Sequence, residues 1–153
     1  MIRSEEEQKC EVATKIWVCT WNMAAKSHFP MLTTEAGTKR VDTSKTSELE
    51  NIIPTNYDIY VFGVQEGVDD GYFELLEAYL KTKEIQRYDI SPKEDRVEGR
   101  GDGSFINSKY TGISVFVNKE KKDVIQFKKA GAVSAGMMEG SKGAAGVVLK
   151  VYG

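Results

Sequence analysis

Cysteine is scarce in this sequence, with only Cys10 and Cys19 among 153 residues. Two thiols are too few for the disulfide framework of a small secreted domain, and Cys19 lies in an apolar strand pattern in which a buried thiol is common. No segment approaches the roughly 18 to 20 consecutive apolar residues of a membrane span, and no Pro-rich or Ser-rich linker divides the chain. We therefore expect one module without disulfides or spanning segments.

The composition is typical of a globular protein, with 41% hydrophobic and 29% charged residues. Residues 1–14 are polar and rich in glutamate, without the apolar core of a secretory signal, so we predict a polar tail and a cytoplasmic location. The formal net charge of −2 gives no general attraction to nucleic acid, and no nucleic-acid partner is expected. Residues 15–153 are expected to form the folded module.

Apolar periodicity divides that module into strands and helices. Residues 16–21 carry β-branched and aromatic side chains on both faces, which predicts a central strand covered on two sides. The other expected strands are 58–64, 111–117, 124–127 and 144–153, and the expected helices are 47–54 and 71–81. Polar segments are expected to form loops at 24–45 and 91–104 and a turn at 118–123. This order indicates an α/β fold with a mixed sheet and flanking helices.

A polar residue of metal-binding type ends each of the first two expected strands. Asn22 follows the apolar run 16–21, and Glu66 follows 58–64. Ligands of open α/β sheets bind at the carboxyl ends of strands, so neighbouring strands would bring an amide oxygen and a carboxylate together. Such hard oxygen ligands suit Mg²⁺. The alternative is that Asn22 caps a turn and Glu66 is a solvated loop residue.

Four motifs then follow one another along the chain. They are "TWNMAAK" at 20–26, "IYVFGVQEG" at 59–67, "KYTGISVFVNK" at 109–119 and "AGMMEGSKGAAGVVLKV" at 135–151. In order and spacing, residues 15–152 resemble the first half of the catalytic domain of the inositol polyphosphate 5-phosphatases, within the endonuclease-exonuclease-phosphatase superfamily. The strand-ending Asn and the Gln-Glu pair are shared across that superfamily, whereas the last motif is sharper for the phosphatases.

The resemblance implies a DNase I-like fold, an α/β sandwich of two sheets flanked by helices, of which this chain would supply one half. It implies removal of the 5-phosphate from inositol polyphosphates or phosphoinositides, with Mg²⁺ as cofactor. By the same resemblance Glu66 would bind the metal, Asn22 would lie in the metal site and Gln65 would support them.

The resemblance also implies a phosphate-binding stretch. Lys142 would contact the substrate phosphate, with Ser141 and Gly143 beside it. The family usually has asparagine where this chain has Ser141, so a phosphate contact would be weaker there or replaced by water. Without the resemblance, Lys142 is interpreted as a turn lysine in solvent.

Two motifs of the family are missing from the sequence. The aspartate that holds the attacking water and the histidine near the scissile phosphate lie in motifs resembling G-D-x-N and S-D-H-x-P, and neither occurs here. The only histidine, His28, is expected to be an ordinary loop residue. We therefore expect residues 15–153 to be the N-terminal portion of a catalytic domain and to be inactive alone. An exposed sheet face would favour self-association or pairing with the missing half.

The interpretation as a phosphatase leaves two alternatives open. A nuclease of the same superfamily would share Asn22 and Glu66. A non-catalytic fragment would bind phosphate or a partner protein, as the missing histidine motif suggests. For the phosphatase, the partners would be inositol phosphates or lipid headgroups, with peripheral contact to a membrane.

Overall fold

A continuous apolar run makes β4 (Ile59–Gly67) the centre of a sheet in the computed structural model, which describes residues 13–89, 92–100, 108–135 and 142–152. Tyr60, Phe62 and Val64 point to one face of the sheet and are fully buried. β1 (Ile16–Asn22) pairs with one edge of β4 in parallel, and β7 (Ser108–Asn118) pairs with the other edge in antiparallel orientation. The sheet is therefore mixed.

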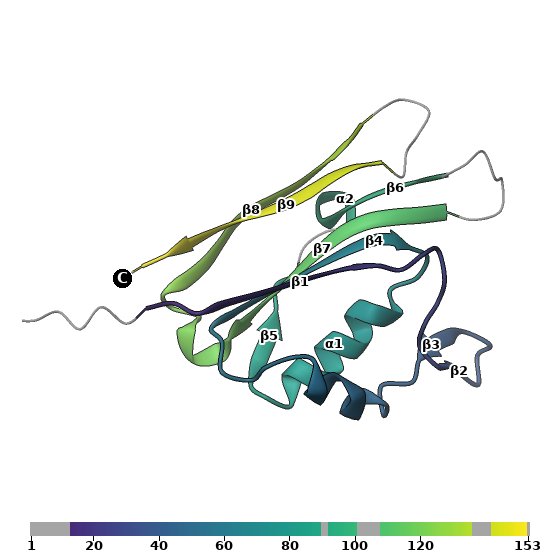
Figure 1. The fold of residues 1–153 in the computed structure, drawn as a ribbon, viewed down its shortest axis with the longest axis horizontal. Helices are drawn as coiled ribbons and strands as arrows, with labels where there is room; N and C mark the ends of the chain where they lie inside the picture. The colour runs from purple at the N-terminus through teal and green to yellow at the C-terminus, as the bar shows by residue number, and fades with distance from the viewer. Residues whose placement is uncertain (1–12, 90–91, 101–107, 136–141, 153) are drawn as a thin grey trace, which may run out of the picture.

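Two short strands complete this five-stranded sheet along the far edge of β7 (Figure 1). β5 (Ile85–Arg87) pairs with the C-terminal residues of β7, and β6 (Arg96–Arg100) pairs with its N-terminal residues. A short helix, α2 (Pro92–Asp95), leads directly into β6. This order leaves β1 at the opposite edge of the sheet.

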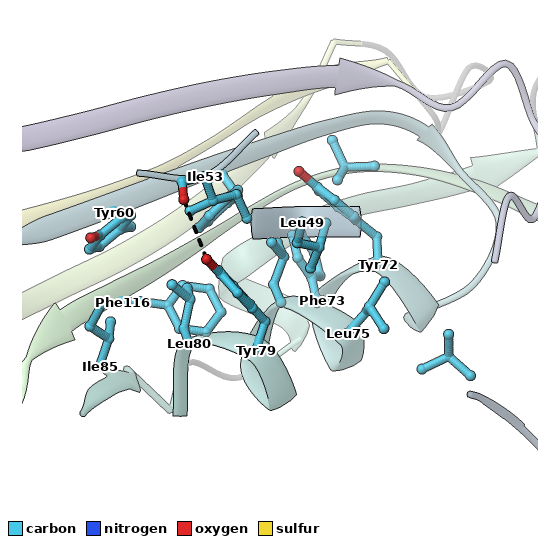
Figure 2. Close-up of a cluster of buried hydrophobic side chains, with 14 of the residues drawn as sticks. Leu49, Ile53, Tyr60, Tyr72, Phe73, Leu75, Tyr79, Leu80, Ile85 and Phe116 are labelled. Carbon is cyan, nitrogen blue, oxygen red and sulfur yellow. Dashed lines mark hydrogen bonds between the residues drawn. The ribbon is translucent and has the colours of Figure 1, made fainter. Parts of the chain in front are cut away.

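Helix α1 (Gly71–Lys81) covers one face of the sheet because one side of the helix is apolar. The Asp69 carboxylate accepts a hydrogen bond of 2.9 Å from the backbone N–H of Gly71, which satisfies one free donor of the first turn. Together with the 3-10 helix η1 (Thr46–Asn51), α1 packs on the buried face of β4, as Figure 2 shows. The principal members of this core are Leu49, Ile53, Tyr60, Phe62, Tyr72, Phe73, Leu76, Tyr79, Leu80 and Phe116.

A β-hairpin lies over the other face of the sheet. β8 (Ile125–Ser134) and β9 (Gly143–Val151) pair in antiparallel orientation, and the 3-10 helix η2 (Lys119–Lys121) connects β7 to β8. A smaller core forms there, made of Ile59, Val115, Val117 and Ile125 with Val147 and Leu149 packed against it. The chain thus has three layers of helix, sheet and hairpin (Figure 1).

The predicted strand at 16–21 is present, but its predicted central position is wrong. Among the residues that the structure describes, no strand pairs with the outer edge of β1. Ile16 and Val18 stay 53% and 67% exposed, while Trp17 and Cys19 on the opposite face pack against the α1 core. Apolar residues on both faces of a strand indicate that both faces can be buried. They do not show that other segments of this chain bury both faces of β1.

Two segments predicted to be loops contain strands. Within 24–45, β2 (Met31–Thr33) and β3 (Lys39–Val41) form a small hairpin whose last residue is buried in the core. Within 91–104, residues 92–95 are helical and 96–100 form β6, while 101–104 lie outside the described residues. Asp95 and Arg96, two of the charged residues that suggested a loop, are buried and paired with each other, so their charge did not indicate solvent exposure.

The remaining expected elements are confirmed, and all but the helix at 71–81 have different ends. Residues 58–64 lie in β4 except for Asp58, 71–81 form α1, and 111–117 lie within β7. The expected helix at 47–54 is the 3-10 helix over 46–51, and β8 runs seven residues beyond the expected 124–127. The α/β class with a mixed sheet is also confirmed. In the described parts of the chain, no helix combines the length and apolarity needed to cross a membrane.

Candidate functional site

The carboxyl ends of β1 and β4 bring Asn22 and Glu66 together. The two strands are parallel neighbours in which Asn22 is the register partner of Gln65, so Glu66 follows immediately after that pair. The Nδ2 atom of Asn22 lies 3.3 Å from Oε1 of Glu66. The side chains of Asn22 and Glu66 meet as predicted, but the amide nitrogen, and not the expected amide oxygen, faces the carboxylate. Their role in binding a metal stays a prediction.

The backbone of Glu66 turns its carboxylate toward Asn22. Trp21 packs toward α1, so its neighbour Asn22 projects to the face on which the hairpin lies. Regular alternation would place Glu66 on the α1 face. Instead, the register between β4 and β7 shifts between Val64 and Gly67, and Glu66 has a left-handed φ of 53°. This bulge re-aims the side chain at the end of the strand.

A third side chain reaches the carboxylate from β7. The Nζ atom of Lys109 lies 3.4 Å from Oε2 of Glu66. The side chains of Lys109 and Glu66 are 20% and 45% exposed, so water screens this ion pair only in part. Sequence reasoning missed Lys109, because its proximity depends on the antiparallel register of β7. The available signal was that Lys109 opens the third motif, just before the strand residues.

The side chain of Gln65 is held by β1. Its Nε2 atom donates a hydrogen bond of 2.6 Å to Oγ1 of Thr20. A Cβ atom on Gly63 would lie 3.3 Å from the same hydroxyl, so glycine at this position leaves room for the contact. Gln65 therefore supports the site by tying β4 to β1 just before both strands end, and Thr20 is a second residue that sequence reasoning missed.

The oxygen of the Asn22 side chain is engaged in the turn that follows β1. Oδ1 accepts a hydrogen bond of 2.9 Å from the N–H of Ala24, which fixes the amide so that its nitrogen faces Glu66. Ala24 and Ala25 have left-handed φ angles of 51° and 54°, and the N–H of Ala25 donates to the carbonyl oxygen of Glu66. The turn role of Asn22 and its contact with Glu66 therefore coexist. A metal bound by Asn22 would use the second lone pair of Oδ1.

The single histidine fastens the loop that follows this turn. The His28 ring stacks on Trp21 with a centroid separation of 5.3 Å, and its Nε2 atom lies 2.7 Å from the carbonyl oxygen of Met23. These contacts agree with the expectation of a loop residue.

The expected phosphate-binding residues fall at the start of β9. Ser141 lies outside the described residues. The carbonyl oxygen of Lys142 accepts a hydrogen bond of 2.8 Å from the N–H of Ala135, and Figure 1 shows β9 starting at the end of the molecule where β1 and β4 finish. Gly143 is required by packing, since a Cβ atom there would lie 2.1 Å from the carbonyl oxygen of Val133.

A small pocket lies beside Lys109, with a volume of about 230 Å³. It is smaller than the ~300 to 1,000 Å³ of most ligand pockets. The pocket is lined by Val68, Asp69, Asp70, Arg96, Glu98, Ser108, Lys109 and Tyr110.

One carboxylate and one amide cannot enclose a metal ion. Over the described ranges, no group of three or more His, Cys, Asp or Glu side chains is arranged to hold one. Mg²⁺, however, usually keeps several waters and is held by one or two carboxylates together with substrate phosphates. The Glu66 carboxylate, with the second lone pair of the Asn22 oxygen, is therefore chemically compatible with a Mg²⁺ ion that is bound jointly with a phosphate.

No protein-family model matches the chain, and no curated protein matches it significantly.

Proposed function

We propose that this chain is the metal-holding N-terminal portion of a Mg²⁺-dependent phosphatase that removes the 5-phosphate from inositol polyphosphates or phosphoinositide headgroups. The observation that carries the proposal is the meeting of Asn22 and Glu66 at the ends of two parallel strands. The start of β9 beside Lys142, at the same end of the molecule, adds support. The DNase I-like two-sheet sandwich belongs to the same proposal, and the layering of helix, sheet and hairpin is compatible with it.

Each residue of the site then has a chemical task. Glu66 would hold the metal, Asn22 would orient the carboxylate through its amide, and Gln65 would brace the two strand ends. Lys109 and Lys142 would bring positive charge to a substrate phosphate. Mg²⁺ bound here would neutralise the negative charge that develops on the phosphate during hydrolysis.

The expected aspartate for the attacking water and histidine near the phosphate have no counterpart motif in the 153 residues. General acid–base help of that kind contributes about 10² to 10⁴ in rate. The chain alone would therefore bind Mg²⁺ and phosphate without appreciable turnover.

Phosphate release from a panel of inositol polyphosphates, and from vesicles containing phosphoinositides, tests the proposal. We expect no release by residues 1–153. We expect Mg²⁺-dependent release by the protein continued beyond Gly153 to the end of its reading frame. Glu66→Gln should abolish that release, and Glu48→Gln, which alters an exposed carboxylate on η1, should not.

The same experiment separates the two alternatives. Cleavage of DNA by the longer protein, without release of phosphate from inositol compounds, would favour the nuclease. Absence of both activities, with binding of phosphate or a protein retained, would favour a non-catalytic module. Either result would overturn the proposed phosphatase.

A further inference from the structure

The segment that follows Glu66 lies directly against the ring of Tyr110. A Cβ atom on Gly67 would lie 2.5 Å from that ring, so glycine allows the backbone to approach it closely. The Tyr110 hydroxyl then donates a hydrogen bond of 2.9 Å to the carbonyl oxygen of Asp69. Tyr110 is only 5% exposed, so this contact is sheltered from water. One aromatic side chain thus holds the backbone at two points within residues 67–69.

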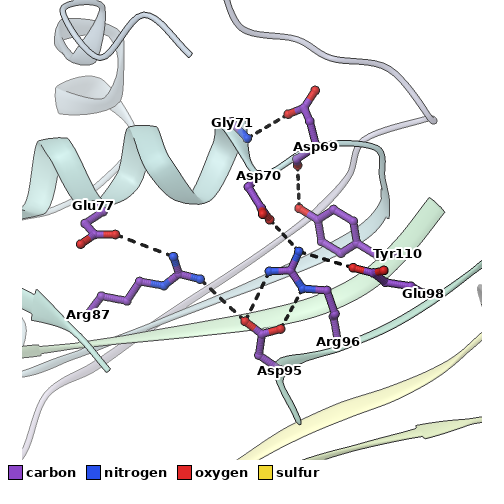
Figure 3. A network of polar contacts seen from close by, with 9 residues as sticks. All are labelled: Asp69, Asp70, Gly71, Glu77, Arg87, Asp95, Arg96, Glu98 and Tyr110. Atoms are coloured by element: carbon purple, nitrogen blue, oxygen red, sulfur yellow. Dashed lines mark hydrogen bonds and ion pairs between the residues drawn. The ribbon is translucent and has the colours of Figure 1, made fainter. Parts of the chain in front are cut away.

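Arg96 holds Tyr110 and the same segment from β6 (Figure 3). Its Cζ atom lies 4.8 Å from the centroid of the Tyr110 ring, and its Nη1 atom lies 2.7 Å from Oδ1 of Asp70. Its Nε atom donates to the buried carboxylate of Asp95 at 2.8 Å. Burial alone would lower the pKa of Arg96, but hydrogen bonds to Asp95 and Asp70 outweigh it and raise the pKa above its ordinary value. The guanidinium therefore stays charged in a site where its side chain is 7% exposed.

The backbone of Glu66 requires such support. A left-handed φ of 53° is unfavourable for a residue with a side chain, and such a conformation persists only where surrounding contacts determine it. One hydrogen bond, from the N–H of Ala25 in the turn after β1, holds Glu66 from one side through its carbonyl oxygen. Tyr110 and Arg96 hold the residues that come next.

We propose that Tyr110 and Arg96 are positioning residues that fix residues 67–70 and thereby keep the Glu66 carboxylate directed at Asn22. This inference rests on the proposed function in taking Glu66 as the metal-binding carboxylate. Neither Tyr110 nor Arg96 is proposed to bind the metal or the substrate. Their role is to make the strained conformation of Glu66 the stable one, so that a cation meets a carboxylate already in place.

Two tyrosines allow a matched test. Tyr110→Phe removes the hydroxyl that donates to Asp69 and keeps the ring. Tyr88→Phe removes a hydroxyl that donates to the carbonyl oxygen of Ile125 at 2.7 Å, on the other face of the sheet, and serves as the control. We expect Tyr110→Phe to raise the Mg²⁺ dissociation constant of the 153-residue chain about two- to tenfold, as expected for one lost hydrogen bond, and Tyr88→Phe to leave it unchanged. Arg96→Lys keeps the charge but loses the planar stacked geometry, and should weaken Mg²⁺ binding in the same direction.

Amide hydrogen exchange supplies a readout that needs no metal. In Tyr110→Phe the amides of residues 66–70 should exchange faster than in Tyr88→Phe, with circular dichroism showing both variants folded. If the unaltered chain binds no Mg²⁺ but exchange still separates the two variants, the positioning role holds and the proposed function fails. Equal exchange at residues 66–70 in the two variants would refute the positioning role, whatever the affinity for Mg²⁺.

Discussion

Lys109 and Asn22 approach the Glu66 carboxylate from two different strands, one at each oxygen. Lys109 Nζ lies 3.4 Å from Oε2, and Asn22 Nδ2 lies 3.3 Å from Oε1. The carboxylate is therefore already partly neutralised by a protein cation. A metal ion entering the site must share the carboxylate with Lys109 or displace it, whereas a phosphate arriving with the metal gains Lys109 as a partner. Lys109 should therefore weaken the binding of Mg²⁺ alone and strengthen the binding of phosphate together with Mg²⁺.

Replacement of Lys109 by methionine should separate these effects. Mg²⁺ alone should bind about two- to fivefold more tightly, because a competing cation is removed from a partly exposed pair. Inorganic phosphate should bind more weakly in the presence of Mg²⁺. Calorimetric titration measures both, and Lys119→Met, which removes a lysine paired with Glu84, is the control. Weaker binding of Mg²⁺ by Lys109→Met would contradict the assigned geometry.

Gly143 should prove necessary for the hairpin, independently of any phosphate. In Gly143→Ala the new Cβ atom would overlap the carbonyl oxygen of Val133, so β9 must shift away from β8 at its start. We expect a loss of about 1 to 3 kcal/mol in the free energy of unfolding, measured by urea denaturation. Gly146→Ala on the same strand has open space around its Cβ and should change stability little. Equal stability of the two variants would show that the close approach is not needed.

The exposed edge strand should drive self-association. β1 carries no charged residue, its outer edge is unpaired among the described residues, and Val18 is 67% exposed. Such an edge can pair with another chain. Val18→Lys should weaken self-association about tenfold or more in sedimentation equilibrium, since like charges brought together at an interface cost several kcal/mol. Leu32→Lys, at a 54% exposed position on β2, should leave association unchanged. Association that survives Val18→Lys would place the contact elsewhere.

Alkaline pH should destabilise the fold through its buried tyrosines. Burial raises the pKa of Tyr60, Tyr72, Tyr88 and Tyr110 above the ordinary value of 10.0. Because the unfolded chain ionises these groups first, their contribution to stability is complete below about pH 10 and is lost as pH rises through the folded-state pKa.

For the well-buried Tyr72, the free energy of unfolding should fall by up to about 1.4 kcal/mol per pH unit above pH 10. Urea denaturation at several pH values measures this slope, and absorbance near 295 nm reports ionisation. Tyr72→Phe should flatten the slope by that amount. An identical slope in the variant would show that Tyr72 ionises freely in the folded state.

Apolar periodicity correctly predicted the elements that have a clear apolar face. The helix 71–81 and the strands that became β4 and β7 each have one strongly apolar face, which must be buried whatever the topology. The predicted loop at 91–104 was wrong at Arg96, because the sequence shows a charged residue but not the two carboxylates that pair with it in a buried position. The edge position of β1 was missed because strand order depends on contacts far apart in the chain.

The candidate site was also predicted in part. Asn22 and Glu66 follow apolar runs, and parallel neighbours end together, so their placement at one edge of the sheet was predictable. Their contact was not, because it needs the bulge that turns Glu66 to the other face. Lys109 and Thr20 join them only through the register of particular strand pairs. The bulge between β4 and β7 sets the direction of the Glu66 side chain, and the residues "VQEG" do not reveal a left-handed glutamate.

Because β1 is an edge strand, it can detach while β4 and β7 stay paired, and this opening would carry Asn22 away from Glu66. A ligand held between these two residues binds only the closed form, so it makes the opening rarer in proportion to its concentration above its dissociation constant. Backbone amides of β1 would then exchange with solvent more slowly as ligand is added, while amides of β8 would keep their rates. The solvent exchange of a single strand would thus report the occupancy of the site without any turnover.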